Sequence, residues 1–332
     1  MYKDSSNENY GHSFPEALFP LFKSDKEYEL IKSVLLERFR DQKKNIMIMY
    51  KYLASQNIPK IVLFSSQLPF GIVIKRLPPE KAWNEVICSK ILTKLHPFDF
   101  NVIYHESLGC ISEKYLIGYD VMTLPVVFLS DNNYIALFFY WLGKCACVAH
   151  VLAIGDRGHN ERLHCKERED LFNISLYTRK SEPIINIDFE DFLSKRVNDI
   201  NVDATEIALL FYSVLVQIPK KLRINIDIDK LFDIFYKGFT AKLDEIKIIW
   251  ANNKNLFKKY LKKLFKIRPQ NNSMSLIRAL NERATGNGKE VLFDNAYRKL
   301  TTGIEKMEID EREKRAHDLL KQKKKLIHFK DY

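Results

Sequence analysis

The pattern of apolar and polar positions divides the chain into a strand-rich first part and a helix-rich second part. Short alternating or apolar runs predict strands at residues 60–64, 71–77, 100–108 and 114–120, the last two separated by a break at Gly109-Cys110. Apolar residues at helical spacing predict two helices within residues 14–52, the second over 27–52, and further helices at 80–95, 134–154, 204–218, 231–239, 243–267, 274–283 and 291–326. Strands at 173–178 and 183–188, joined by a turn at 179–182, complete an α+β pattern.

Composition agrees with a globular protein. The 332 residues are 46% hydrophobic and include 22 Phe, enough for a full core. Four of the five Cys lie inside apolar runs, which indicates buried, reduced thiols and a cytoplasmic protein. Residues 134–154 are apolar enough to suggest a membrane span, but the run ends directly in a polar loop. We therefore interpret it as a buried helix and expect no transmembrane segment.

The residues with the clearest chemistry lie between 149 and 191. Asp156, Asn173 and Asp188 each stand at the end of a predicted helix or strand. A carboxylate, an amide and a second carboxylate, each just outside a buried element, are the groups that a phosphoryl-transfer site needs. One acid orients the attacking hydroxyl, and the other two groups hold Mg²⁺ against the nucleotide phosphates.

Two short motifs in this stretch resemble the phosphatidylinositol 3- and 4-kinases of the protein-kinase-like superfamily. Their catalytic stretch reads roughly GIGDRHxxN, then a strand and HIDFG, and this chain has AIGDR at 153–157 and NIDF at 186–189. The resemblance implies a two-lobed fold, with a small β-rich N-lobe and a mostly helical C-lobe carrying extra C-terminal helices. It also implies ATP and Mg²⁺ as ligands, with Asp156 and Arg157 as catalytic residues.

Two departures from the family pattern affect the predicted metal site. The family has its metal-binding Asn five residues after the catalytic Asp, where this chain has Glu161. Asn173 lies fifteen residues before Asp188, close to the family's spacing on that side, so we predict that Asn173 and Asp188 bind the metal. Residues 162–172 are then an insertion, and Glu161 is the reserve ligand. Glu190 stands where the family has the Gly of its DFG motif.

Residues that could bind the nucleotide precede this stretch. Lys75 lies in a predicted strand and Glu85 in the following helix, the order of the ion pair that holds the phosphates in kinases; the alternative is two surface charges. Ser65 and Ser66 form a turn that could meet phosphate oxygens, although either could be an ordinary turn residue. Val121 lies in the linker expected to contact adenine, or belongs to the core.

The charge distribution singles out one further region. Of the net charge of +11, residues 220–268 hold fourteen Lys or Arg against five acids. Their centre, KNLFKKYLKKLFKI at 254–267, is an amphipathic helix that could bind an anionic membrane, nucleic acid or an acidic protein. It could also be a surface helix whose apolar side faces the core.

These observations predict four segments and leave the function open between three hypotheses. The segments are an N-terminal tail with appended helices (1–52), an N-lobe (53–120), a catalytic C-lobe (121–220) and a basic helical extension (221–332). The leading hypothesis is an ATP- and Mg²⁺-dependent phosphotransferase acting on a lipid, small-molecule or protein hydroxyl. The alternative is a weak or inactive kinase-like protein that binds an anionic partner through its basic helices. Transfer of AMP on the same fold is the third.

Overall fold

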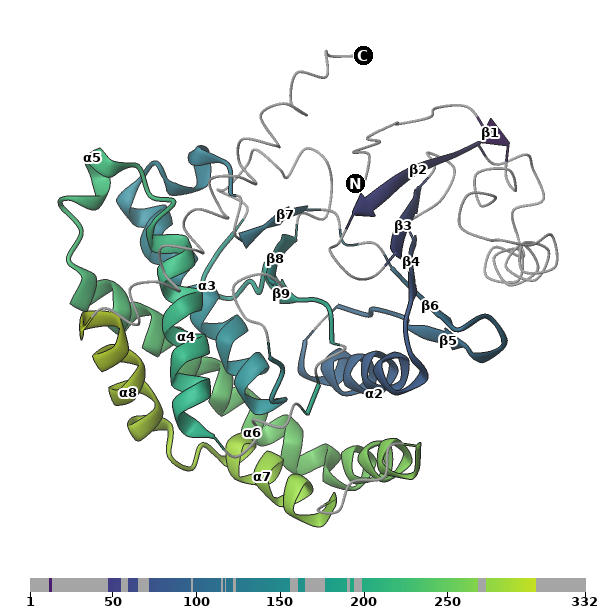
Figure 1. Cartoon of the computed structure of the whole chain (residues 1–332). Coiled ribbons are helices and arrows are strands. Elements are labelled where there is room, and N and C mark those ends of the chain that lie inside the picture. The colour runs from purple at the N-terminus through teal and green to yellow at the C-terminus, as the bar shows by residue number, and fades with distance from the viewer. Residues whose placement is uncertain are drawn as a thin grey trace. The chain divides into compact units, whose positions relative to one another are not determined.

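The computed structural model describes residues 12–13, 47–54, 59–64, 72–96, 98–114, 116, 118–121, 124–155, 161–164, 177–189, 192–193, 199–267 and 273–302. The chain forms two compact units: unit 1 comprises Met1–Thr93 and Pro97–Leu116, and unit 2 comprises Lys94–His96 and Ile117–Tyr332. Strands prevail in the described part of unit 1 and helices in that of unit 2 (Figure 1). The α+β class expected from the sequence is confirmed. The units divide at 116–117, where the sequence predicted 120–121, and the segments predicted at 121–220 and 221–332 lie in one unit.

Unit 1 contains an antiparallel sheet with the strand order β1-β2-β3-β4-β6-β5 (Figure 1). Its strands are β1 His12–Ser13, β2 Met47–Ala54, β3 Pro59–Phe64, β4 Ile72–Arg76, β5 Ile103–His105 and β6 Cys110–Lys114. A short 3-10 helix, η2 Glu106–Leu108, connects β5 to β6. It ends at Gly109, whose φ of 60° is a left-handed conformation that glycine adopts without steric cost, and the hairpin closes there.

Helix α2, Pro79–Leu95, covers one face of this sheet. Lys75 in β4 and Tyr104 in β5 both lie directly opposite Ile111 of the intervening strand, so the three side chains share a face. Trp83 of α2 contacts the ring of Tyr104, with centroids 5.9 Å apart. The face that carries Lys75 is therefore the face on which α2 packs.

Unit 2 combines a small antiparallel sheet with a helical layer (Figure 1). The sheet order is β7-β8-β9, with β7 Gly118–Asp120, β8 Glu161–His164 and β9 Ile184–Asn186. The helices are η4 Val126–Leu129, α3 Asn132–Val151, α4 Ile200–Leu215, α5 Lys220–Arg223, α6 Ile228–Ile267, α7 Ser273–Thr285 and α8 Lys289–Thr302. Asp131 and Asp199 cap α3 and α4 by accepting hydrogen bonds from backbone N–H groups of the first turn.

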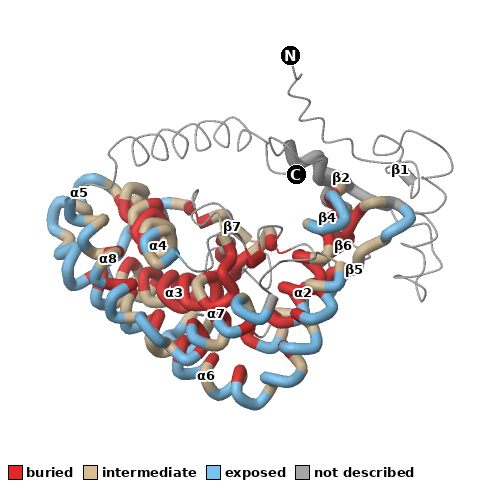
Figure 2. The backbone as a smooth tube through the Cα atoms, turned by 60° about the horizontal axis from the view of Figure 1, so that its bottom comes forward, coloured by how far each residue is buried: buried red, intermediate tan, exposed pale blue. Residues whose placement is uncertain are grey.

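Helix α3 is the central element of unit 2 and is buried over most of its length (Figure 2). Helix α6 packs along it, and the two backbones meet at Gly143 and Gly238. A Cβ at Gly143 would overlap the carbonyl of Phe235, and one at Gly238 would overlap that of Tyr140. Phenylalanines fill the adjoining core: Phe139, Phe211, Phe232, Phe235, Phe239 and Phe293.

Several predicted elements agree with the structure. They are the strands at 60–64, 71–77 and 183–188 and the helices at 80–95, 134–154, 204–218 and 274–283, each within a few residues of β3, β4, β9, α2, α3, α4 and α7. Helix α3 is long and apolar enough to cross a membrane, but 72% of its apolar window is buried inside the structure. The four described cysteines, Cys88, Cys110, Cys145 and Cys147, are buried and form no disulfide with one another.

Other predictions were wrong. Residues 47–52, predicted as the end of a helix, belong to β2, where they pair with β3. The strand pair predicted at 100–108 and 114–120 is the β5–β6 hairpin, while Gly118–Asp120 pairs with β8 in unit 2. Helices predicted at 231–239 and 243–267 are one continuous helix, α6. The remainder of the predicted helices at 14–52 and 291–326, and most of the predicted strand at 173–178, lie outside the described residues.

Candidate functional site

In unit 1 a buried ion-pair cluster surrounds Lys75. The side chain of Lys75 is only 5% exposed, and its Nζ lies 3.2 Å from Oε1 of Glu85 in α2 and 2.7 Å from Oε1 of Glu113 in β6. A buried ammonium group is tolerated only where opposite charges compensate for its lost hydration. The Lys75–Glu85 pair expected from the sequence is therefore present, and the alternative of two surface charges is wrong for both residues.

Glu113 is a member of this cluster that sequence reasoning missed. It lies opposite Val73 in the β4–β6 register and is thus the diagonal neighbour of Lys75 on the same face. Its side chain is 10% exposed. In the sequence, Glu113 is indicated only as an acid inside the strand CISEK, which is otherwise buried. Its place beside Lys75 follows only from the strand pairing.

In unit 2 Asp188 follows β9 and has an unusual backbone conformation. Its φ is 63°, a left-handed value that is uncommon for residues other than Gly, Asn and Asp. Two residues earlier, the side-chain amide of Asn186 donates a hydrogen bond of 3.1 Å to the carbonyl oxygen of Cys145 in α3. That bond holds the end of β9 against the central helix α3. Asp188 therefore follows a strand whose end is held in place.

A β-bridge joins the two halves of the predicted catalytic stretch. Ile154, two residues before Asp156, forms an antiparallel bridge with Phe192, four residues after Asp188. Ala153 and Leu193, each next to a bridge residue, also have positive φ values, 49° and 54°. Strained non-glycine backbone of this kind clusters at functional sites in proteins, and here it surrounds the bridge.

Glu161, the reserve metal ligand, begins β8 and lies directly opposite Asn186 in β9. Residues directly opposite each other share a face, so Glu161 is on the side of the sheet to which Asn186 points. Glu161 is 1% exposed. Within the described ranges, no group of three or more His, Cys, Asp and Glu side chains is placed to hold a metal. A metal bound there would need ligands from other sources, such as nucleotide phosphates.

Val121, predicted to line the nucleotide site, is fully buried. The side chain of Gln217 holds the segment around it: Nε2 donates to the carbonyl oxygen of Val121 at 2.7 Å, and Oε1 accepts from the N–H of Leu124 at 2.9 Å. Sequence reasoning missed this clamp because Gln217 lies 96 residues away. The remaining predicted site residues, Asp156, Arg157, Ser65, Ser66 and Asn173, lie outside the described part of the chain.

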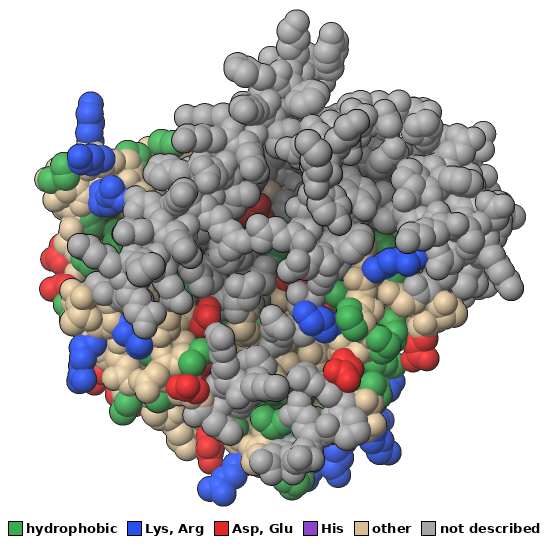
Figure 3. All heavy atoms as spheres, viewed as in Figure 1, with side chains coloured by type: hydrophobic (Ala, Val, Ile, Leu, Met, Phe, Trp, Pro, Cys, Tyr) green, Lys and Arg blue, Asp and Glu red, His purple; other side chains and the backbone are tan. Residues whose placement is uncertain are grey.

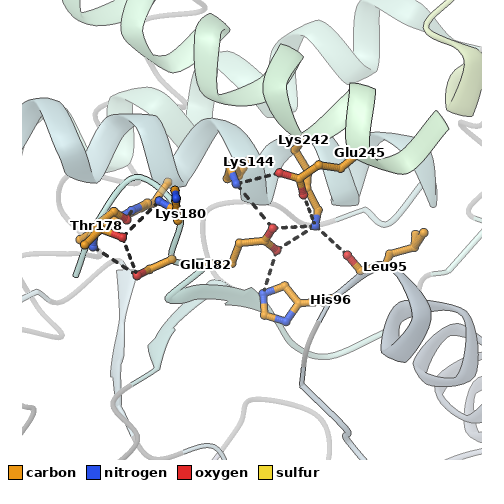
Figure 4. A network of polar contacts seen from close by, with 10 residues as sticks. Leu95, His96, Lys144, Thr178, Lys180, Glu182, Lys242 and Glu245 are labelled. Atoms are coloured by element: carbon orange, nitrogen blue, oxygen red, sulfur yellow. Dashed lines mark hydrogen bonds and ion pairs between the residues drawn. The ribbon is translucent and has the colours of Figure 1, made fainter. Parts of the chain in front are cut away.

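A second buried ionic cluster lies within unit 2 and ties the segment before β9 to the helices (Figure 4). The Nζ of Lys242 in α6 donates to both carboxylate oxygens of Glu182 at 2.8 Å and to the carbonyl oxygen of Leu95 at 2.7 Å. Lys144 of α3 lies 3.5 Å from Glu182 and 3.1 Å from Glu245. Two lysines from different helices therefore hold Glu182, six residues before Asp188.

The electrostatics of this cluster follow from burial and from the shared charges. Burial raises the pKa of Glu182, and Lys242 and Lys144 offset the shift only in part. Burial acts on Glu245 in the same direction, but there the two lysines prevail and its pKa is lowered. For Lys144 burial favours the neutral form, yet the two glutamates outweigh it and raise its pKa. Glu182 is thus the member whose charge is most costly to the fold.

Comparison with known proteins adds no assignment. No protein-family model matches the sequence, and no curated protein matches it.

Proposed function

We propose that this protein is an ATP- and Mg²⁺-dependent phosphotransferase that transfers the γ-phosphoryl group to a hydroxyl acceptor. The observation that carries the proposal is the bridge between Ile154 and Phe192. This bridge pairs the segment that precedes Asp156 with the segment that follows Asp188, and these two segments flank the two halves of the kinase-like motif. The strained backbone at Ala153 and Leu193, each next to a bridge residue, supports it, since strain is maintained where function requires it.

The charged groups of each unit suit the roles that the resemblance implies. Lys75, oriented by Glu85 and Glu113, would bind phosphate oxygens, and Asp156 would orient the acceptor hydroxyl. Asp188 and one further side chain would hold Mg²⁺, because this ion is usually bound by one or two carboxylates together with substrate phosphates. Mg²⁺ supplies neutralisation of the charge that develops on the transferred group.

The strand register supports Glu161 as the second metal ligand, the role that the sequence spacing gives to Asn173. Glu161 begins β8 five residues after Asp156 and lies across from Asn186, two residues before Asp188. The backbone of Glu161 therefore lies at the end of the sheet from which the chain continues to Asp188. Glu161→Gln should then abolish Mg²⁺-dependent turnover, while Asn173→Ala should leave most of it. The reverse outcome would restore the assignment made from sequence spacing.

The proposal is tested by thermal unfolding with and without ATP and Mg²⁺, followed by an ATP-consumption assay. Asp188→Asn should remove both Mg²⁺-dependent stabilisation and turnover. Asp233→Asn is the matched control, because it makes the same change at an exposed acid of α6 that pairs with Lys237. Release of ADP identifies phosphoryl transfer, whereas release of pyrophosphate would identify AMP transfer. A parent protein that binds no nucleotide under any of these conditions would refute the proposal.

A second candidate, a kinase-like binding protein without turnover, is favoured by one observation. The Nζ of Lys75 lies closer to Glu113, at 2.7 Å, than to Glu85, at 3.2 Å. Two carboxylates therefore compete with phosphate for the same ammonium group. If this competition suppresses turnover, Glu113→Gln should increase nucleotide binding and Glu85→Gln should not. ATP binding without ATP consumption in the parent protein would establish this second candidate.

A further inference from the structure

The basic helix of the sequence is the C-terminal half of α6, and its apolar side is buried. Phe257, Leu261 and Leu264 are each 1% exposed, so they are not available to enter a bilayer. The lysines of this half are exposed: Lys254, Lys258, Lys259, Lys262, Lys263 and Lys266. The surface-helix interpretation is therefore correct for the apolar side, while the lysine side is open to an anionic partner.

A cavity of about 200 Å³ lies between this half of α6 and α7. Trp250 and Phe257 of α6, whose rings are 4.8 Å apart, form part of its wall, and Ile277 and Met274 of α7 complete the apolar lining. Trp250 donates a hydrogen bond of 2.8 Å to Oδ1 of Asn281, which joins the two helices beside the cavity. Met274 is 65% exposed at the rim.

The rim of this cavity carries a strong positive charge. Lys254, Lys258 and Arg278 all line it. Arg278 is paired with Glu282 at 2.9 Å, whereas no ion pair links Lys254 or Lys258 to an acid in the described part of the chain. The sequence contains no Asp or Glu between Glu245 and Glu282. On the face drawn in Figure 3, by contrast, described side chains of both signs are interspersed.

We propose that this α6–α7 cavity binds an acidic peptide segment of a partner protein, which inserts one bulky apolar side chain. The volume suits a single ring, since a cavity of about 150 Å³ holds benzene, and it is below the range of about 300–1,000 Å³ typical of small-molecule sites. Acidic residues on either side of the inserted side chain would meet Lys254 and Lys258. The further lysines along α6 extend the attraction beyond the cavity.

The geometry favours a peptide over the other anionic partners. A bilayer requires an exposed apolar side, which this helix lacks. Single-stranded nucleic acid is usually held by exposed aromatic side chains on which bases stack, whereas the aromatic side chains of this cavity, Trp250 and Phe257, are buried in its wall. A partly open, mainly apolar cavity with a cationic rim fits an apolar anchor flanked by carboxylates. This inference does not depend on the proposed phosphotransferase activity.

The test uses the full chain and fluorescence anisotropy at low salt. The probe is a short labelled peptide of Glu and Asp with one central Phe, and its partner probe has Ala in place of Phe. The Phe peptide should bind about tenfold more tightly or better, because burial of one large apolar side chain is worth about 1.5–3 kcal/mol. Equal binding of the two peptides would overturn the proposal.

Charge variants then locate the site. Lys254→Gln combined with Lys258→Gln should weaken binding of the Phe peptide about tenfold, at roughly threefold per exposed lysine. The matched control, Lys220→Gln with Lys221→Gln on α5, removes the same charge from exposed positions elsewhere and should change binding less than about twofold. Equal losses in the two pairs would show that only net charge matters, and would refute a specific cavity.

Two further probes decide between classes of partner. Oligothymidylate and phosphatidylserine-containing vesicles should bind more weakly than the Phe peptide. Met274→Glu places an acid on the exposed rim and should weaken binding of the Phe peptide several-fold. Binding of the oligothymidylate and of the vesicles should not change in this variant. Tighter binding of either probe than of the peptide would assign the surface to nucleic acid or to a membrane, and would overturn the peptide proposal.

Discussion

Replacement of Lys75 by Met should destabilise unit 1 severely, although the change is from a buried charge to an apolar side chain of similar length. The side chains of Glu85 and Glu113 are 0% and 10% exposed, and both form ion pairs with the Lys75 ammonium group. Loss of one partner from a buried pair typically costs about 3–5 kcal/mol, because the other charge remains buried without compensation. Here two carboxylates lose their partner, so we expect at least that range.

The same reasoning predicts a rescue. Glu85→Gln and Glu113→Gln, added to Lys75→Met, remove the two carboxylate charges that no longer pair with Lys75. The triple variant should recover at least about half of the lost stability. The recovery stays incomplete because each buried amide still needs hydrogen-bond partners, at about 1–3 kcal/mol for each group left unsatisfied. Lys114→Met is the matched control in the same sheet. Lys114 pairs at 3.4 Å with Asp99, which is 61% exposed, so its loss should cost no more than about 1 kcal/mol.

Urea unfolding followed by tryptophan fluorescence measures these differences. The chain has three Trp, and only Trp83 lies in unit 1, where it contacts Tyr104. Parent and variants are therefore compared in a background with Trp141→Phe and Trp250→Phe, whose own effects cancel in each difference. If Lys75→Met costs no more than Lys114→Met, or if the triple variant is less stable than the single one, the buried cluster does not carry the energy assigned to it.

Three predictions concern unit 2. Lys242→Met should cost about 3–5 kcal/mol at neutral pH by leaving Glu182 buried without its main partner. Burial already raises the pKa of Glu182, so the contribution of this carboxyl group to stability is lost as pH rises through its folded-state pKa. The destabilisation caused by Lys242→Met should therefore shrink on acidification. A destabilisation that does not change with pH in urea titrations would contradict this account. Burial lowers the pKa of His150, so the parent protein should lose stability as pH falls below the ordinary histidine pKa, by at most about 1.4 kcal/mol per pH unit. In the same urea titrations, His150→Gln should lose less stability than the parent between pH 7 and pH 5. Gly143→Ala should cost about 1–3 kcal/mol or more, measured as a lowered urea midpoint, because its Cβ would meet the Phe235 carbonyl; an unchanged midpoint would mean that α3 and α6 separate easily.

Local pattern was sufficient for many elements, and together with the family resemblance it predicted one ion pair. Strands such as β4 and helices such as α3 were predictable because their apolar periodicity matches the faces that they bury. Lys75 and Glu85 were predicted as a pair because a strand lysine followed by a helix glutamate is the order found in kinases, although the pattern also allowed two surface charges. In these cases the chemistry is contained in residues close together along the chain.

Other features depend on residues that are distant in sequence. Glu113 joins Lys75 only through the β4–β6 register, and Gln217 reaches Val121 across 96 residues. Helix α6 continues past Lys242, where a break was predicted, and that buried lysine bonds to Glu182 and the Leu95 carbonyl, both distant in sequence. A residue's own pattern cannot report such partners, since it records only that a polar side chain is present.

The candidate catalytic stretch shows the same division. The motif, the order of its parts and its residue types could be recognised in the sequence, and they identified Asp156 and Asp188 as the candidate functional acids. The sequence spacing favoured Asn173 as the second metal ligand, whereas the proposal of Glu161 depends on the pairing of β8 with β9. The bridge from Ile154 to Phe192 and the left-handed backbone at Asp188 were decided by tertiary structure alone. Packing stabilises the positive φ values at Ala153 and Leu193, next to the bridge, because local propensity disfavours this conformation for both residues.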